Sequence, residues 1–351
     1  MMTPAGRTAL AALLLVAGHE VSRRASALET VTADQPPATL TETGLYDARV
    51  VDAIDRRNHS FVPQYPLWSD GALKRRWVYV PQGERIDTSD PDAWDFPIGT
   101  RFWKEFSFQG RKVETRMLWK ITADQWSAAT YVWNDDGSEA TLAPEEGTAS
   151  RFEVAPDRLH RIPSRSDCGA CHGDRRKPLG FNRLQLSTDR DPNAIHAEPL
   201  TPGMMTLQEL VRDGLLSHTS EDLLRNPPRI AASTPTTRSA LGYLSTNCGT
   251  CHDGTDAISA ALPSLTSREV MKDGDAVARS LVGRASRWQA PGRAEGTTLL
   301  VDPQSPADSA ILLRMKSRRP SSQMPPLGTV TRDEAAVKAI EQWIEEITGS
   351  R

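Results

Sequence analysis

The feature that most constrains this chain is a five-residue pattern, CxxCH, which occurs twice. The first motif runs from Cys168 to His172 and the second from Cys248 to His252, and together they contain all four cysteines of the 351 residues. This spacing is typical of haem c attachment, because two thiols add to the vinyl groups of one haem while the next imidazole binds the iron. The sequence predicts two covalently bound haem c groups, held by Cys168, Cys171 and His172 and by Cys248, Cys251 and His252.

The spacing of the two motifs argues against a zinc site or a redox disulfide. Neither of those needs a histidine directly after the second cysteine, and here one follows twice. Zinc ribbons also place their two CxxC pairs about 15–20 residues apart, whereas residues 172 to 247 lie between these pairs. We therefore favour haem over zinc.

The first 27 residues have the pattern of a secretory signal peptide. Arg7 precedes an apolar run over residues 9–17, and the small residues 25–27 form a cleavage site before Leu28. The apolar run is shorter than the ~20 residues that cross a bilayer, so we expect no transmembrane anchor in the mature chain. Because haem c is attached outside the cytoplasm, signal and motifs together predict a periplasmic protein.

Length and composition predict a chain of several domains. A net charge of −3 is close to balanced and gives no reason to expect nucleic acid as a partner. The expected boundaries are a flexible tether at 28–42, a tryptophan-rich β domain at 43–157, a first haem segment at 158–228 and a second haem domain at 229–351.

Residues 43–157 carry the patterns of β-strands. Seven of the nine tryptophans lie between Trp68 and Trp133, and short alternating runs are separated by turn residues such as those at 109–110 and 134–137. We expect an antiparallel β-sandwich or a partly open barrel. Aromatic residues at strand spacing usually form core, so we expect the tryptophans to pack inside rather than to line a ligand groove.

The rest of the chain is expected to be mainly helical. Ser164 and Asp167 can cap a short turn before the first motif, and Thr206 begins a capping box. A helix should lead directly into Cys248, and another capping box should open a final amphipathic helix after Thr331. Residues 253–304 are interpreted as an enlarged loop region. The pattern over residues 229–351 resembles a class I cytochrome c, which makes the expected fold class α+β with mainly α-helical cytochrome c-like haem domains.

The iron of the second haem needs a ligand opposite His252. A methionine sulfur often fills that position in cytochromes c. Met324 is the favoured candidate, because it lies on a proline-stiffened loop just before the final helix, where a class I cytochrome places this ligand. Met315 and Met271 are the alternatives.

For the first haem the distal ligand is left open. Met204 or Met205 follows a Pro-Gly pair and precedes a capped helix, as Met324 does. His160, His196 or His218 would instead give ligation by two histidines, and an open or externally supplied ligand is the third alternative.

At this point the chain resembles a family of exported proteins that join a tryptophan-rich β domain to two haem c sites. The resemblance covers most of the mature chain and implies His252 and Met324 as axial ligands of the second haem, but it supplies no substrate. The residues that carry it are Tyr65 to Ala72, Phe96 to Thr100, Glu114 to Arg116, Tyr131 to Asn134, Ile162 to Ser164, Asn247 to Gly249 and Met324 to Gly328.

Three functions fit these patterns. The first is a periplasmic dihaem c-type cytochrome that passes single electrons between a redox protein partner, or a small donor, and an acceptor. The second is a dihaem peroxidase or oxidase whose first haem keeps an open position. The third is a haem-containing ligand-binding or sensing module. We expect an electron carrier rather than an enzyme, and no catalytic side chain is assigned.

Overall fold

The structure is a computed structural model that describes residues 35–349, apart from residues 51, 173–177, 219–221, 256–260 and 295. The chain divides into residues 1–35 and a compact unit formed by residues 36–351. The expected signal peptide at 1–27 and the first part of the expected tether lie outside the described residues.

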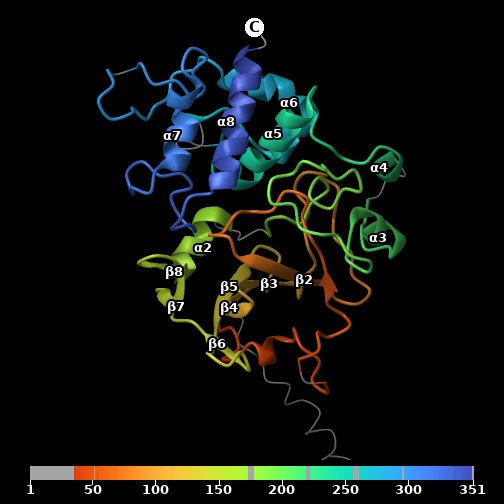
Figure 1. Ribbon diagram of the computed structural model, residues 1–351. Helices are drawn as coiled ribbons and strands as arrows, with labels where there is room; N and C mark the ends of the chain where they lie inside the picture. The colour runs from red at the N-terminus through yellow and green to blue at the C-terminus, as the bar shows by residue number, and fades with distance from the viewer. Residues whose placement is uncertain are drawn as a thin grey trace, which may run out of the picture. The chain divides into compact units, whose positions relative to one another are not determined.

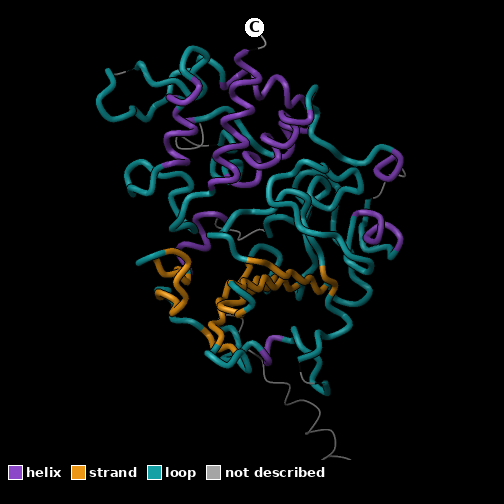
Figure 2. The backbone as a smooth tube through the Cα atoms, viewed as in Figure 1, coloured by secondary structure: helices purple, strands orange, loops and turns teal. Residues whose placement is uncertain are grey.

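Strands dominate the first half of the described chain and helices the second (Figures 1 and 2). The elements in chain order are η1 (Thr41–Thr43), β1 (His59–Ser60), β2 (Leu73–Tyr79), β3 (Arg101–Phe108), β4 (Arg111–Lys120), β5 (Trp126–Trp133), β6 (Ala140–Leu142), β7 (Thr148–Ala155), β8 (Arg158–Ile162), α2 (Arg165–His172), α3 (Leu207–Arg212), α4 (Asp222–Arg225), α5 (Pro235–Asn247), α6 (Ser267–Leu281), η3 (Pro306–Asp308), α7 (Ala310–Lys316) and α8 (Glu334–Gly349).

Six strands form one antiparallel sheet in the order in which they occur in the chain, β1 to β6, and β7 pairs with β8 separately. The turn between β3 and β4 was predicted, and its residues Gln109 and Gly110 have φ of 50° and 80°. Two consecutive positive φ values suit the right-handed twist of a tight hairpin. A bulge next to Phe106 adds a residue to β4 near this turn.

Different segments cover the two faces of the sheet. One face packs the buried rings of Trp77, Trp103 and Trp133 against Leu40 and Leu45, which precede the first strand. At one end of the other face, Phe102 and Trp126 pack against apolar residues from the segment between α2 and α5, such as Phe181 and Leu207. The tryptophans of the sheet are therefore mostly core, as predicted.

Helices α5, α6, α7 and α8 share one core, but they do not close it alone. Thr234 caps α5 by accepting a hydrogen bond from the backbone N–H of Thr237, and a proline occupies the first turn. The same core includes Tyr65, from the segment between β1 and β2, and Leu184, from the segment between α2 and α3. Side chains far apart in the sequence thus complete the interior of the helical part.

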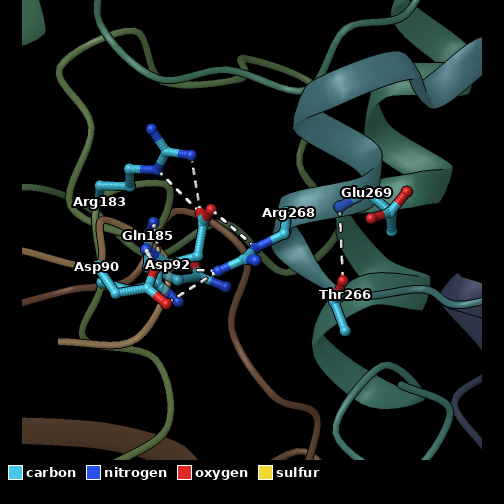
Figure 3. A network of polar contacts seen from close by, with 8 residues as sticks. Asp90, Asp92, Arg183, Gln185, Thr266, Arg268 and Glu269 are labelled. Atoms are coloured by element: carbon cyan, nitrogen blue, oxygen red, sulfur yellow. Dashed lines mark hydrogen bonds and ion pairs between the residues drawn. The ribbon is translucent and has the colours of Figure 1, made fainter. Parts of the chain in front are cut away.

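A charged network connects α6 to two segments from the other half of the chain. Asp92 accepts hydrogen bonds from Arg183 at 2.8 Å and forms an ion pair with Nε of Arg268 at 3.1 Å. A second carboxylate, Asp90, accepts a hydrogen bond from Nη2 of Arg268 at 3.0 Å. Figure 3 shows Arg268 reaching from its helix to both aspartates. Part-buried Asp92 therefore binds two guanidinium groups at once.

The expected fold class is wrong. The strands form a single open sheet of six plus a separate pair, instead of a sandwich or barrel. Within residues 158–228 the structure describes strand β8 and three short helices, α2, α3 and α4, of 8, 6 and 4 residues, joined by long loops. Mainly helical cytochrome c-like domains are therefore not found. The physical reason is that loops from elsewhere cover both sheet faces and also enter the helical core, so neither part needs the partner layer that strand or helix periodicity suggests.

One smaller expectation is also wrong. The interval 253–304, expected to be loop, contains the 15-residue helix α6, which has non-helical backbone angles at Asp273. No helix in the described ranges is both long and apolar enough to cross a membrane.

Candidate haem attachment sites

The first motif lies on helix α2, and the predicted cap before it is present. The backbone N–H of Ser164 donates to the side chain of Asp167 at 2.9 Å, and the N–H of Asp167 donates to the Ser164 hydroxyl at 3.0 Å. This reciprocal pair begins the helix just ahead of the motif. Cys168, Cys171 and His172 then occupy positions i, i+3 and i+4, which share one face of a helix. One planar group can therefore reach both thiols and the imidazole.

The second motif continues the last turn of α5. The N–H groups of Cys251 and His252 both donate to the carbonyl of Cys248, at 3.1 and 2.9 Å, and His252 itself is buried. The carbonyl of His252 accepts from the N–H of Leu265 at 2.9 Å. Gly249 is in close contact with backbone, because a Cβ there would lie 2.5 Å from the Leu265 carbonyl oxygen. This glycine lets the motif pack directly against the segment before α6.

The two motifs touch each other although 81 positions separate the atoms in contact. The thiol of Cys251 lies 3.8 Å from the backbone oxygen of Ala170, in the middle of the first motif. Among the electrostatic effects on the thiol of Cys171 is that of Cys251. The structure therefore shows that the two CxxCH motifs are neighbours.

None of the four cysteines is in a disulfide. Burial raises the pKa of the Cys248 thiol to about 12, with a further contribution from Cys251, and burial also raises the pKa of Cys171. Within the described residues, no group of three or more His, Cys, Asp or Glu side chains is placed to hold a metal ion.

Met324 lies on the loop between α7 and α8 and is half-buried. Its N–H donates to the carbonyl of Arg314 at 3.0 Å, and the side chain of Gln323 donates to the carbonyl of Pro326 at 3.1 Å. The loop is fixed further along by Asp70, whose carboxylate accepts from the N–H of Thr331 at 2.9 Å. Ligation by Met324 stays a prediction, as do its alternatives Met315, which is buried on α7, and Met271, which is half-buried on α6.

The three histidine candidates for the first haem each have a carboxylate partner. His160 is buried, with Nε2 2.8 Å from Glu114, and its Nδ1 has no hydrogen-bond partner among the described residues. His196 lies 2.8 Å from Asp333, the residue that caps α8. The exposed His218 lies 3.7 Å from Asp87, an acidic residue before β3. Of the three histidines, His160 is the nearest in sequence to the first motif.

The two methionine candidates differ in their surroundings. Met205 is buried in the cluster formed by Phe61, Phe102 and their neighbours, and its N–H donates to the carbonyl of Ser60 at 2.7 Å. Met204 is half-buried, and its sulfur accepts from the N–H of Thr201 at 3.5 Å. Met205 has a packing role that accounts for it, whereas Met204 is the more accessible of the two.

A buried guanidinium provides a test of whether these residues suit haem. Nε and Nη1 of Arg318 are buried and have no hydrogen-bond partner among the described residues, while Nη2 donates to the carbonyl of Met315 at 2.8 Å. Buried donors normally have partners, so these two N–H groups of one cation suit an anionic partner. Arg318 and Cys248 both act electrostatically on Tyr243. A haem carboxylate near the second motif fits this arrangement.

Sequence reasoning missed the polar residues that hold the sites together. Asn247, directly before the second motif, accepts from the N–H of Trp68 at 3.0 Å and donates to the carbonyl of Tyr243 at 3.0 Å. Asp70 and Asn247 were quoted only within stretches that carry a resemblance, and Arg318 was not singled out. The signal that could have identified Asp70 is the Asp-Gly pair, since Asp70 has φ of 52° and turns the chain.

Comparison of the chain with protein-family models, with curated proteins and with solved structures gives no match.

Proposed function

We propose that this chain is an exported protein with two covalently bound haem c groups that transfers single electrons between redox partners. The observation that carries the proposal is the contact between the two CxxCH motifs, with Cys251 3.8 Å from the oxygen of Ala170. Two attachment sites in contact suit a relay in which an electron enters at one haem and leaves at the other. The partners are a redox protein or a small donor and acceptor, and the compartment is the periplasm.

When bound, haem supplies reversible one-electron chemistry at iron. The chain's own residues hold and tune it. The four thiols fix its position, and His172 and His252 each offer a ring nitrogen to an iron. Arg318 can donate hydrogen bonds from two buried N–H groups to a haem carboxylate. Its positive charge near the iron would favour the reduced state of that haem. Burial of His252 limits access of water to the second site.

The first experiment counts haems. The full chain is produced in a host that attaches haem c, and covalent haem is measured by a pyridine haemochrome assay and by haem staining after denaturing electrophoresis. We expect two haems per chain. Paired changes of Cys168 and Cys171 to Ala, or of Cys248 and Cys251 to Ala, should each leave one. A wild-type chain without covalent haem would refute the proposal.

The second experiment separates a carrier from an enzyme. Absorption and EPR spectra of the oxidised protein, with and without cyanide, are compared with those of Met324→Ala. A carrier should have two low-spin irons that do not react with cyanide, and the variant should convert one of them to high spin. A first haem that binds cyanide in the wild-type protein would favour the enzyme.

That second function, a dihaem oxidoreductase with an exchangeable site at the first haem, is favoured by one observation. His196 and His218 pair with carboxylates, and Met205 is packed in a core. Each of these candidates for the first haem therefore has another structural role. Turnover with hydrogen peroxide, measured against a reduced electron donor, tests this function directly.

A further inference from the structure

Three adjacent strands carry a row of basic residues on one face of the sheet. Arg76 on β2 is directly opposite Lys104 on β3, and Lys104 is directly opposite Arg116 on β4. Lys74 lies two residues before Arg76 and therefore points to the same face. Arg76 is buried and the other three are half-buried. The row is therefore partly removed from water.

Carboxylates pair with the two ends of the row but leave its lysines without an ion pair. Glu198 binds Arg76 at 2.5 Å, and Glu114 binds Arg116 at 2.5 Å. The ammonium group of Lys104 lies over the ring of a phenylalanine, 5.0 Å from its centroid. Neither lysine of the row forms a salt bridge with any carboxylate in the part of the chain that the structure describes.

One further carboxylate is close but already engaged. Asp333 acts electrostatically on Lys74, yet its oxygens lie 2.8 Å from Nε2 of His196 and 3.0 Å from the hydroxyl of Tyr243. It also caps helix α8 through the N–H of Ala336 at 3.0 Å. Asp333 is therefore held by groups other than the lysines.

The charge of the two lysines is only partly balanced, because Glu198 acts electrostatically on both of them but is paired with Arg76. Like charges directly opposite in a sheet destabilise the pair, and burial adds a desolvation cost. Burial, together with the charge of Arg76, lowers the pKa of Lys74 to about 8 and lowers that of Lys104 well below its usual value. A negatively charged group between the lysines would offset the repulsion between them and restore their pKa values toward the usual range.

The row lies close to the first CxxCH motif. Arg116 and Lys104 both act electrostatically on the thiol of Cys171. On β5, the residue opposite Arg116 is Thr130, and Thr130 borders the same small cavity as Cys168. Helix α2 is in contact with β5. An anion held by the row would therefore lie next to the first haem.

We propose that Lys74, Lys104 and Arg116 form a binding site for a carboxylate or an oxyanion at the first haem. The proposal rests on the proposed function, because it assigns a ligand class to the surroundings of that haem. Two sources supply this chemistry. One is the propionate groups of the first haem itself, and the other is a free anion that binds beside it.

The test uses the full-length protein with both haems attached. Lys104→Met removes the charge and keeps the length of the side chain, and Lys104→Arg restores the charge. Lys112→Met is the matched control. Lys112 lies on β4, in the same β3–β4 hairpin as Lys104, and its ammonium group also lies over an aromatic ring, 4.0 Å from the centroid of Trp133. Its side chain, however, is on the opposite face of the sheet. Lys74→Met is a second variant in case Lys104→Met does not fold.

Two measurements are made on each protein. An EPR-monitored redox titration gives the potential of the first haem, and a titration with inorganic phosphate, followed by the absorption of that haem, gives an anion affinity. Lys104→Met should favour the ferric state about tenfold, ~59 mV for one electron, because positive charge near iron stabilises the reduced form. Lys104→Arg should restore the wild-type value, and Lys112→Met should keep it.

The outcomes distinguish the two sources. A potential shift without any saturable response to phosphate assigns the site to the haem propionates. A saturable response in the wild type that weakens at least tenfold in Lys104→Met assigns it to a free anion. The proposed anion site would be refuted if Lys104→Met and Lys74→Met both gave the same haem potential and the same phosphate affinity as Lys112→Met. Haem content is measured in parallel, so wild-type protein that lacks covalent haem refutes the proposed function instead.

Discussion

Gly169 and Gly249 occupy the same position in the two motifs, yet alanine should have opposite effects at them. An added Cβ at Gly249 would lie 2.4 Å from the Ser245 oxygen and 2.5 Å from the Leu265 oxygen, whereas one at Gly169 has no atom within 4 Å. Both oxygens belong to the backbone and cannot rotate away. Reaching 3.0 Å, below which real Cβ atoms essentially never approach, needs a movement of about 0.6 Å.

The magnitude follows from that overlap. Overpacking a well-filled site costs ~1–3 kcal/mol, and the upper end applies to Gly249→Ala because backbone must move. Gly169 lies inside helix α2, where alanine is favoured over glycine by up to ~1 kcal/mol. The two variants should therefore differ by about 3–4 kcal/mol in free energy of unfolding, with Gly249→Ala the less stable.

The assay is urea denaturation followed by tryptophan fluorescence, with haem content measured on the same samples. For a slope of ~3 kcal/mol per molar urea, the two midpoints should lie about 1 M apart. We also expect Gly249→Ala to lose haem from the second motif, while Gly169→Ala keeps both haems. Equal midpoints and equal haem content would mean that the second motif does not pack against Leu265, and the reasoning would fail.

Three further predictions concern residues around the sites. Asp70→Ala should cost ~3 kcal/mol, because its carboxylate accepts from the N–H and the hydroxyl of Thr331, while Asp70→Asn should cost less; urea denaturation compares them. Burial favours the neutral acid of Glu114, but Arg116 and the hydrogen-bonded imidazole of His160 outweigh it and lower the pKa of Glu114 in the folded protein. Ionised Glu114 should therefore stabilise the folded protein above the unfolded-state pKa of ~4.3, and this contribution should be lost as pH falls through the lowered folded-state pKa. Thermal unfolding against pH should show this dependence in the wild type and not in Glu114→Gln. Arg318→Met should lower the potential of the second haem in a redox titration, and an unchanged potential would exclude a nearby haem carboxylate.

Local features of this chain were predictable because short-range chemistry determines them. Ser164 and Asp167 cap α2 as the sequence indicates, and the alternation in β3 places Phe102 and Phe106 in the interior. The hairpin turn at 109–110 follows from its glycine. Each of these depends on neighbours within a few positions in the sequence.

Long-range packing was not predictable in the same way. The alternation of a strand indicates which of its residues are buried but not which residues cover them. Here Leu40 covers one face of the sheet and Phe181 covers the other, and both lie outside the strands. The close approach of Tyr65 to α5, where a Cβ on Gly242 would lie 2.1 Å from the ring, has no local signal. The contact between the two motifs was equally invisible, since the spacing of cysteines indicates a haem but not its neighbour.

The insertion of Tyr65 and Trp68 against α5 has a consequence for the order in which the chain folds. The hydrogen bond from Trp68 to Asn247 spans 179 positions, so it forms only after a long loop closes. Closing such a loop is slow compared with forming a hairpin or a helix. The segment ahead of the second motif therefore acquires its final surroundings late, after the strands have begun to pair.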